Sequence, residues 1–176
     1  MEERMIFAGA GGQGLMTLGK VLAQAAMEAG LEVTWYPSYG AEVRGGTAHC
    51  HVVVADGEIY SPLVERASVL VIMNEPSLKR FGARLADDGL LVLNTSLAEK
   101  PASSNGTVLA VSATDVANEL KNIRVANMVM LGALNGVRRI VADEYIEKAL
   151  ASFLRGRKAL IDLNLEAYAR GCECVA

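Results

Sequence analysis

Residues 9–26 read GAGGQGLMTLGKVLAQAA, and this stretch decides which fold the chain is expected to adopt. The run RMIFAGA (4–10) that leads into it is typical of a strand, and apolar residues recur at helical spacing over 13–29. LEVTWYP (31–37) is a second strand-like run. A strand, a glycine turn, a helix and a strand predict a βαβ unit, which implies a parallel sheet with a right-handed crossover.

After this unit the chain continues to alternate between strand and helix patterns. Asp56-Gly57 lies between TAHCHVVV (47–54) and EIYS (58–61), which predicts an antiparallel hairpin at the edge of the sheet, because Asp-Gly favours hairpin turns. We therefore expect a Rossmann-like, three-layer α/β fold, with a mostly parallel sheet, a β-hairpin insertion and C-terminal helices. Further strands are predicted over 67–74, 89–96 and 108–113, and further helices over 75–85, 113–121, 122–141, 142–156 and 157–171.

The length and composition are those of one globular domain over 1–176, with an α/β part over 1–121 and a helical part over 122–176. Of its residues, 52% are hydrophobic, and the net charge of −3 comes without a basic tract, so nucleic acid is not an expected partner. No apolar run reaches the roughly 18 residues of a membrane span, and MEERMIFAGAGG does not resemble a secretory signal. We interpret the chain as cytoplasmic.

The glycine turn has the spacing of a dinucleotide-binding site but lacks its other half. Its glycines allow backbone N–H groups to approach a phosphate at a helix N-terminus. A nicotinamide site also needs an acid at the end of the second strand, and that strand ends Thr34-Trp35-Tyr36-Pro37. The Lys-[Ser/Thr] of an ATP-binding P-loop is absent as well. The turn therefore suits another anion or a close approach by another chain, and a non-binding tight turn is the alternative; the candidate residues are Gly9, Gly11, Gly12, Gln13, Gly14 and Thr17.

A second glycine-rich stretch, PSYGAEVRGG (37–46), follows the second strand directly. In a parallel sheet this places it at the carboxyl end, beside the first glycine turn, where open α/β sheets bind ligands. The alternative is a hairpin-entry loop with a solvent-exposed pair of Glu42 and Arg44. As a ligand or partner loop it would use Ser38, Tyr39, Glu42, Arg44, Gly45 and Gly46.

No catalytic or metal-binding set is evident. The serines at 38, 61, 68 and 77 have no obvious His/Asp companions, and His49 and His51 share one strand face without an indicated third metal ligand. The three cysteines, Cys50, Cys172 and Cys174, fit no zinc or iron–sulfur spacing. We expect no catalytic residue and no metal in this chain, so that any redox centre would belong to another chain.

Several motifs together resemble one known family, from about Met5 to Gly171. They are GAGGQG with the following T-x-x-x-x-L-A, then YPSYGAEVRGG, then the segment ending IYSP, and finally N-x-x-x-LGAL; the matching single residues include Thr17, Leu22, Ala23, Asn127 and Asn164. The chain resembles the gamma subunit of 2-oxoacid:ferredoxin (acceptor) oxidoreductases, the pyruvate/ketoisovalerate/2-oxoglutarate oxidoreductase gamma family. The resemblance implies a Rossmann-like subunit of a larger enzyme.

Such enzymes decarboxylate a 2-oxoacid oxidatively and form an acyl-CoA. The resemblance implies that thiamine diphosphate, iron–sulfur clusters and coenzyme A belong to the complex, with no cofactor bound by this chain alone. Its partners would be the thiamine-diphosphate-binding and iron–sulfur subunits, and the isolated chain could form a homodimer. The first glycine turn would contact a coenzyme A phosphate or a partner, and 2-oxoglutarate is the favoured substrate. The alternative function is a stand-alone nucleotide-binding or regulatory α/β module.

Overall fold

The computed structural model describes residues 1–38 and 47–175. Their strands form one six-stranded sheet in the order β2-β3-β1-β4-β5-β6. The strands are β1 (Glu2–Ala10), β2 (Glu32–Ser38), β3 (Thr47–Ala55), β4 (Ala67–Ile72), β5 (Leu85–Asn94) and β6 (Thr107–Val111). The helices are α1 (Leu15–Glu28), α2 (Glu75–Phe81), α3 (Ala113–Glu119), α4 (Ala126–Arg138), α5 (Asp143–Phe153) and α6 (Lys158–Glu173), with short 3-10 turns at Gly82–Arg84 and Ile123–Val125.

One strand runs against the other strands of the sheet. Strands β1, β4, β5 and β6 pair in parallel, whereas β3 is antiparallel to both of its neighbours, β1 and β2. Strand β2 therefore runs in the same direction as β1 without touching it. The α/β fold with a mostly parallel sheet is confirmed, and so are the predicted first, second and later strands and the three C-terminal helices.

The predicted hairpin between 47–54 and 58–61 was wrong. The two strands of the βαβ unit, β1 and β2, are also not neighbours in the sheet, because β3 lies between them. Strand β3 does not pair with 58–61, which forms no strand; it pairs along its whole length with β2 on one side and β1 on the other. Both edges of β3 are thus occupied, and no edge is left for a further strand. Instead, Ile59 and Val64 pack onto the face of the sheet. In the sequence, α1 connects β1 to β2. In the sheet the two strands are not hydrogen bonded to each other, because β3 lies between them and pairs with both.

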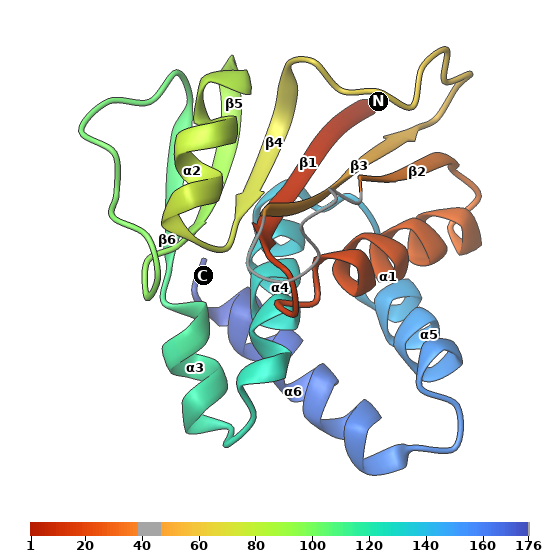
Figure 1. Cartoon of the computed structure of the whole chain (residues 1–176). Coiled ribbons are helices and arrows are strands. Elements are labelled where there is room, and N and C mark those ends of the chain that lie inside the picture. Colours follow the sequence, from red (N-terminus) through yellow and green to blue (C-terminus); the bar gives the residue numbers. More distant parts are fainter. Residues whose placement is uncertain (39–46, 176) are drawn as a thin grey trace.

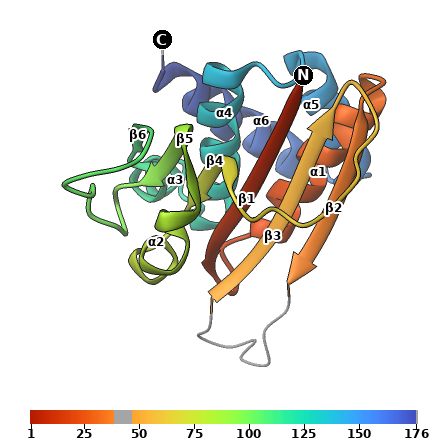
Figure 2. The same cartoon turned by 90° about the horizontal axis from the view of Figure 1, so that it is seen from above.

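The helices cover the two faces of the sheet unequally (Figures 1 and 2). Helices α1, α3, α4, α5 and α6 lie on one face, where alternate residues of the strands, such as Met5, Phe7 and Val71, form the larger core cluster. The second face carries only α2 and the segment 56–66, which crosses in front of β3 in Figure 2. Ile6, Ile72 and Phe81 belong to its smaller core cluster. The two clusters follow the alternation of side chains along a strand.

Helices α4 and α6 cross at unusually close range. A Cβ added to Gly132 would lie 2.0 Å from the Tyr168 carbonyl oxygen, and one added to Gly171 would lie 2.0 Å from the Val129 carbonyl oxygen. The two glycines therefore let the two backbones touch, in the manner of small residues at helix crossings. No helix within 1–38 and 47–175 has the length and apolarity needed to cross a bilayer.

Candidate functional site

The first glycine turn lies at the carboxyl end of β1 and leads directly into α1. Gln13 closes it: its backbone N–H donates to the Ala10 carbonyl oxygen at 3.2 Å, and its side-chain Oε1 accepts from the Ala10 N–H at 2.6 Å. Gly12 has φ of 95° and Gly14 has φ of 76°, the left-handed region in which glycine is favoured. The turn therefore favours glycine at positions 12 and 14 for its backbone conformation.

The turn is packed tightly from behind. A Cβ at Gly14 would lie 2.5 Å from Asn127 Nδ2, which donates to the Gly14 carbonyl oxygen at 3.0 Å. A Cβ at Gly9 would lie 2.8 Å from the Cβ of Met73, at the end of β4. Asn127, on α4, therefore fixes the turn against the helical layer. This contact gives a structural reason for the asparagine of the N-x-x-x-LGAL motif.

The outer side of the turn is open. Gly11 and Gly12 are exposed, and a Cβ at Gly12 would meet nothing within 4 Å. Helix α1 begins without a side-chain cap and without an acid in its first turn, so its N-terminal partial positive charge is not neutralised by its own residues. Thr17 is half-buried in that first turn. This arrangement can accept an anion or a backbone carbonyl group.

Only the flanks of the second glycine-rich stretch belong to the described residues. Tyr39, Glu42, Arg44, Gly45 and Gly46 lie outside the described residues. Its flanking residues are in the sheet, with Ser38 opposite His49, and with Thr47 opposite Ala10 of the first turn. Ser38 and Thr47 thus lie at the edge of the sheet where the first turn begins, and the position of the stretch itself stays a prediction.

Arg80 is a further candidate that the sequence analysis missed. Its Nη1 donates to Thr47 Oγ1 at 3.1 Å, although the two residues belong to α2 and β3. The arginine lies in the helix pattern EPSLKRF, which carries no sign of this contact. Only the tertiary fold brings its positive charge to the edge where the glycine turn lies.

The two histidines of β3 lie on the same face, as expected, with ring centroids 5.6 Å apart. His51 Nδ1 accepts from the Val64 N–H at 3.1 Å, so the neutral ring carries its proton on Nε2. Burial, reinforced by His51, Arg80 and Arg84, lowers the pKa of His49 to about 4. Burial and Arg84 also lower the pKa of His51. Both rings are therefore neutral at pH 7.

Cys50 and Cys172 lack the lowered pKa of a reactive thiol. Cys50 faces the opposite side of β3, where burial raises the pKa of its thiol to about 12. Burial likewise raises the pKa of Cys172, whose Sγ lies 3.4 Å from the Gly132 carbonyl oxygen. Within 1–38 and 47–175, no group of three or more His, Cys, Asp or Glu side chains could hold a metal ion.

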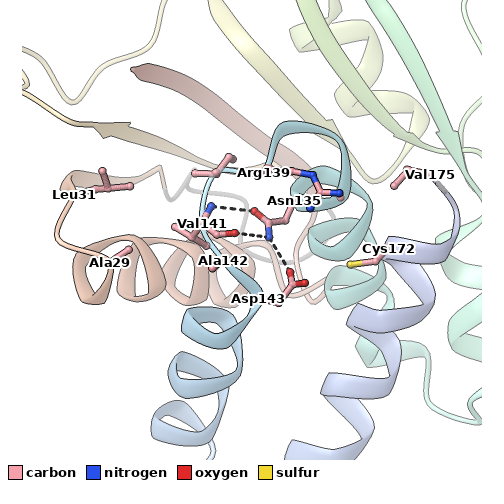
Figure 3. Close-up of a pocket in the computed structure, with 11 residues that line it drawn as sticks. Ala29, Leu31, Asn135, Arg139, Val141, Ala142, Asp143, Cys172 and Val175 are labelled. Carbon is pink, nitrogen blue, oxygen red and sulfur yellow. Dashed lines mark hydrogen bonds between the residues drawn. The ribbon is translucent and has the colours of Figure 1, made fainter.

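A cavity of about 650 Å³ lies at the other end of α1, away from the glycine turn (Figure 3). Asn135 links its walls by donating to Val141 O at 3.0 Å and to Tyr168 Oη at 2.8 Å, and Tyr168 donates to Asp143 at 2.5 Å. Burial, followed by the Asp143 carboxylate, raises the pKa of Tyr168. The polar groups of this network satisfy one another and tie α4, α5 and α6 together, which accounts for them structurally.

The fold and the turn define a Rossmann-like α/β chain whose glycine turn is packed against α4 on one side and open on the other. Residues 4–174 match the family described as pyruvate ferredoxin/flavodoxin oxidoreductase, and the chain belongs to this family.

Its relatives differ in length and in the substrate that they are named for. It is 38% identical to the ketoisovalerate oxidoreductase subunit VorA of Methanothermobacter thermautotrophicus, over 98% of this chain and 36% of VorA. It is 31% identical to the 2-oxoglutarate synthase subunit KorC of Methanocaldococcus jannaschii, over 98% of this chain and 94% of KorC. The chain thus spans about a third of the length of VorA and nearly all of KorC.

A solved structure shares the whole fold. The gamma subunit of a keto/oxoacid ferredoxin oxidoreductase from Geobacter sulfurreducens superimposes with a TM-score of 0.85 at 30% identity, with 98% of each chain covered. A contact between the glycine turn of this chain and a phosphate or a partner stays a prediction.

Proposed function

We propose that this chain is the gamma subunit of a multi-subunit 2-oxoacid:ferredoxin oxidoreductase. The observation that carries the proposal is the match over residues 4–174, which is supported by the end-to-end similarity to a separate gamma subunit. In this proposal the complex decarboxylates a 2-oxoacid oxidatively and forms an acyl-CoA. Thiamine diphosphate and iron–sulfur clusters are held by the partner subunits, and this chain contributes interfaces and a contact near coenzyme A.

The proposed contact is the outer side of the glycine turn. Gly11 and Gly12 are exposed there, and the uncapped N-terminus of α1 favours a negative group such as a coenzyme A phosphate. The companion residues Ser38, Tyr39, Glu42, Arg44, Gly45 and Gly46 remain predictions from the sequence.

The contact can be tested with Gly12→Asp and its uncharged match Gly12→Asn. Both side chains tolerate left-handed backbone, and nothing lies within 4 Å of the Cβ position. In the assembled enzyme we expect Gly12→Asp to raise the KM for coenzyme A roughly fivefold, equal to about 1 kcal/mol, with little change for Gly12→Asn. Equal KM values for the two variants would rule out a phosphate at the turn. Loss of assembly in both would assign the turn to a partner chain instead.

We propose 2-oxoglutarate as the substrate because KorC, a relative of nearly the same length, carries that name. The similarity to VorA makes a branched-chain 2-oxoacid the substrate to compare it with. Reduction of ferredoxin by the purified complex, measured with 2-oxoglutarate, pyruvate, 2-oxoisovalerate and indolepyruvate, decides between them. A clear preference for any of the other three acids would overturn this part of the proposal.

Co-purification from the native host tests the proposal as a whole. A thiamine-diphosphate-binding subunit and an iron–sulfur subunit should accompany this chain. If the chain elutes alone, as a monomer or homodimer, and binds NADH, FAD or ATP tightly in a calorimetric titration, it is a stand-alone nucleotide-binding module instead.

A further inference from the structure

The second face of the sheet is only partly covered and exposes large side chains. It carries α2 and the segment 56–66, while five other helices pack on the opposite face (Figure 2). Tyr60 is 90% exposed and Leu63 is 49% exposed on that segment, and Tyr36 on the edge strand β2 is 46% exposed. Tyrosine side chains exposed to this extent are common where a partner covers a surface.

A row of aromatic rings crosses this face. The Phe81 and His49 ring centroids are 4.7 Å apart, those of His49 and His51 are 5.6 Å apart, and those of His51 and Tyr36 are 6.2 Å apart. The row begins at α2, crosses β3 and ends at the exposed Tyr36. We call the row and the two arginines beside it the aromatic–basic strip; its residues are Tyr36, His49, His51, Arg80, Phe81 and Arg84.

Arg80 and Arg84 bring positive charge to the Phe81 end of the strip, where their guanidinium carbons lie 5.2 and 5.9 Å from the ring centroid. Their hydrogen bonds go to neutral acceptors, because Arg80 donates to Thr47 Oγ1 and Arg84 to the backbone oxygens of Val64 and Glu65. Within 1–38 and 47–175, neither arginine has an ion pair with a carboxylate.

The positive charge of the two arginines also affects the pKa values of the neighbouring histidines. The pKa of His49 is lowered by burial and then by His51, Arg80 and Arg84, and no described carboxylate counteracts them. The whole chain nevertheless has a net charge of −3. The strip therefore carries the positive charge of two arginines without a described ion pair, and this charge would attract a negatively charged surface.

We propose that the aromatic–basic strip docks an acidic segment of a partner subunit of the same enzyme, an inference that rests on the proposed function. Arg80 and Arg84 receive carboxylates of that segment, and Tyr36, with Tyr60 and Leu63 nearby on the same face, covers its apolar side chains. Tyrosine and arginine are the residue types that most often dominate the binding energy of interfaces.

Two observations favour a partner subunit over a second copy of this chain. In VorA the matching segment is 36% of the polypeptide, so a unit of this kind is covalently joined there to a much larger remainder. A second copy, in addition, would present the same positive strip in a symmetric contact, and like charges facing each other oppose association.

The test compares strip variants with matched variants on a distant surface. Arg80→Glu reverses an exposed charge on the strip, and Arg155→Glu makes the same change in the loop before α6. Tyr36→Ser removes a ring that is 46% exposed, and Phe153→Ser removes a ring exposed to the same extent on α5. Circular dichroism and thermal unfolding first establish that each variant is folded.

The affinity of each variant for the purified partner subunits is then measured by biolayer interferometry at several salt concentrations. We expect Arg80→Glu and Tyr36→Ser to weaken binding at least about tenfold, and the two controls to stay within about twofold. Salt should weaken the wild-type complex more steeply than the Arg80→Glu complex. Wild-type affinity in both strip variants would overturn the strip while leaving the proposed function intact.

Other outcomes also decide the matter. If the wild-type chain binds no partner subunit, the proposed function fails and the strip fails with it. If Arg80→Glu and Tyr36→Ser change only the self-association of the chain in gel filtration, the occupant is a second copy, and the assignment to a partner subunit is overturned.

Discussion

Gly14 combines two constraints at one residue, since its backbone is left-handed and its missing side chain leaves room for Asn127. Each constraint alone would favour glycine, and together they make the position intolerant of any side chain. The glycine at position 14 is therefore explained by packing within the chain, whether or not the turn holds a ligand.

The two constraints can be separated by mutation. Gly14→Ala should cost about 1 kcal/mol for its left-handed φ and more for displacing Asn127. Gly30→Ala is the matched control, because Gly30 has φ of 80° but nothing within 4 Å of its Cβ position, so it should cost only the backbone part. Urea unfolding measures both free energies. Equal losses would mean that Asn127 moves aside without cost.

His49 should make the stability of the chain depend on pH. The pKa of His49 is about 4 in the folded state against 6.5 ordinarily, so the unfolded chain takes up the proton first as the pH falls. Its neutral form stabilises the fold fully above pH 6.5, and that contribution is lost progressively as the pH falls toward 4. The urea midpoint should drop over this range in the wild type and drop less in His49→Gln, which cannot titrate. Parallel pH profiles for the two proteins would contradict the prediction.

Among the elements, the crossing of α4 and α6 depends on glycine contacts between backbones. The Cβ of an alanine at Gly132 would meet the Tyr168 carbonyl oxygen at 2.0 Å, and a carbonyl group of a helix cannot rotate away as a side chain can. One turn further on, a Cβ at Gly136 would meet Val175 Cγ2 at 2.6 Å, which is the end of the side chain of the last described residue.

These two positions provide a matched pair of variants. Gly132→Ala should force the helices apart and lower stability by about 3 kcal/mol or more, whereas Gly136→Ala should cost about 1 kcal/mol or less. Thermal unfolding followed by circular dichroism compares them directly. A small effect of Gly132→Ala would mean that α6 can shift along α4 without loss of packing.

Local patterns in the sequence predicted most of the elements, but they could not predict which strands pair. The runs over 4–10 and 31–37 and the helix between them are all present. Strand β3, however, inserts between β1 and β2, because its buried residues Cys50 and Val53 pack into both core clusters. Asp-Gly at 56–57 favours a turn, and the chain does bend there. It then leads into a segment that packs on the face of the sheet.

The site was predictable to a similar degree. The glycine motif located the first turn at the end of β1, because the turn is encoded by contiguous residues. Arg80, by contrast, donates a hydrogen bond to Thr47, which lies 33 positions earlier in the sequence. A contact of that kind depends on where α2 is placed over the sheet, and no local pattern contains that information.

For the molecule as a whole, the unequal cover of the sheet gives the two sides of the protein different surfaces. The helix-covered half holds the larger core and the closely packed crossing of α4 and α6. The thinly covered half carries the exposed tyrosines and the charge of Arg80 and Arg84. Both faces contribute to the core, because Phe81 of the strip is buried with Ile6 and Ile72 on the thinly covered side. A recognition variant therefore has to be made at an exposed strip residue such as Arg80 or Tyr36.

The central position of β1 has a further consequence, for the newly made chain. Both neighbours of β1 come later in the sequence: Ala10 pairs with Thr47, and Ala8 pairs with Ile72. Translation proceeds at about 5–20 residues per second, so the roughly 60 residues that follow β1 up to the end of β4 take about 3 to 12 seconds to appear. Until the end of that time the apolar residues Met5–Ala8 lack at least one of their two neighbouring strands, since β3 ends at Ala55 and β4 only at Ile72. An apolar strand with an unpaired edge favours aggregation, so the interval before β3 and β4 are both made is one in which the newly made chain is open to association with other chains.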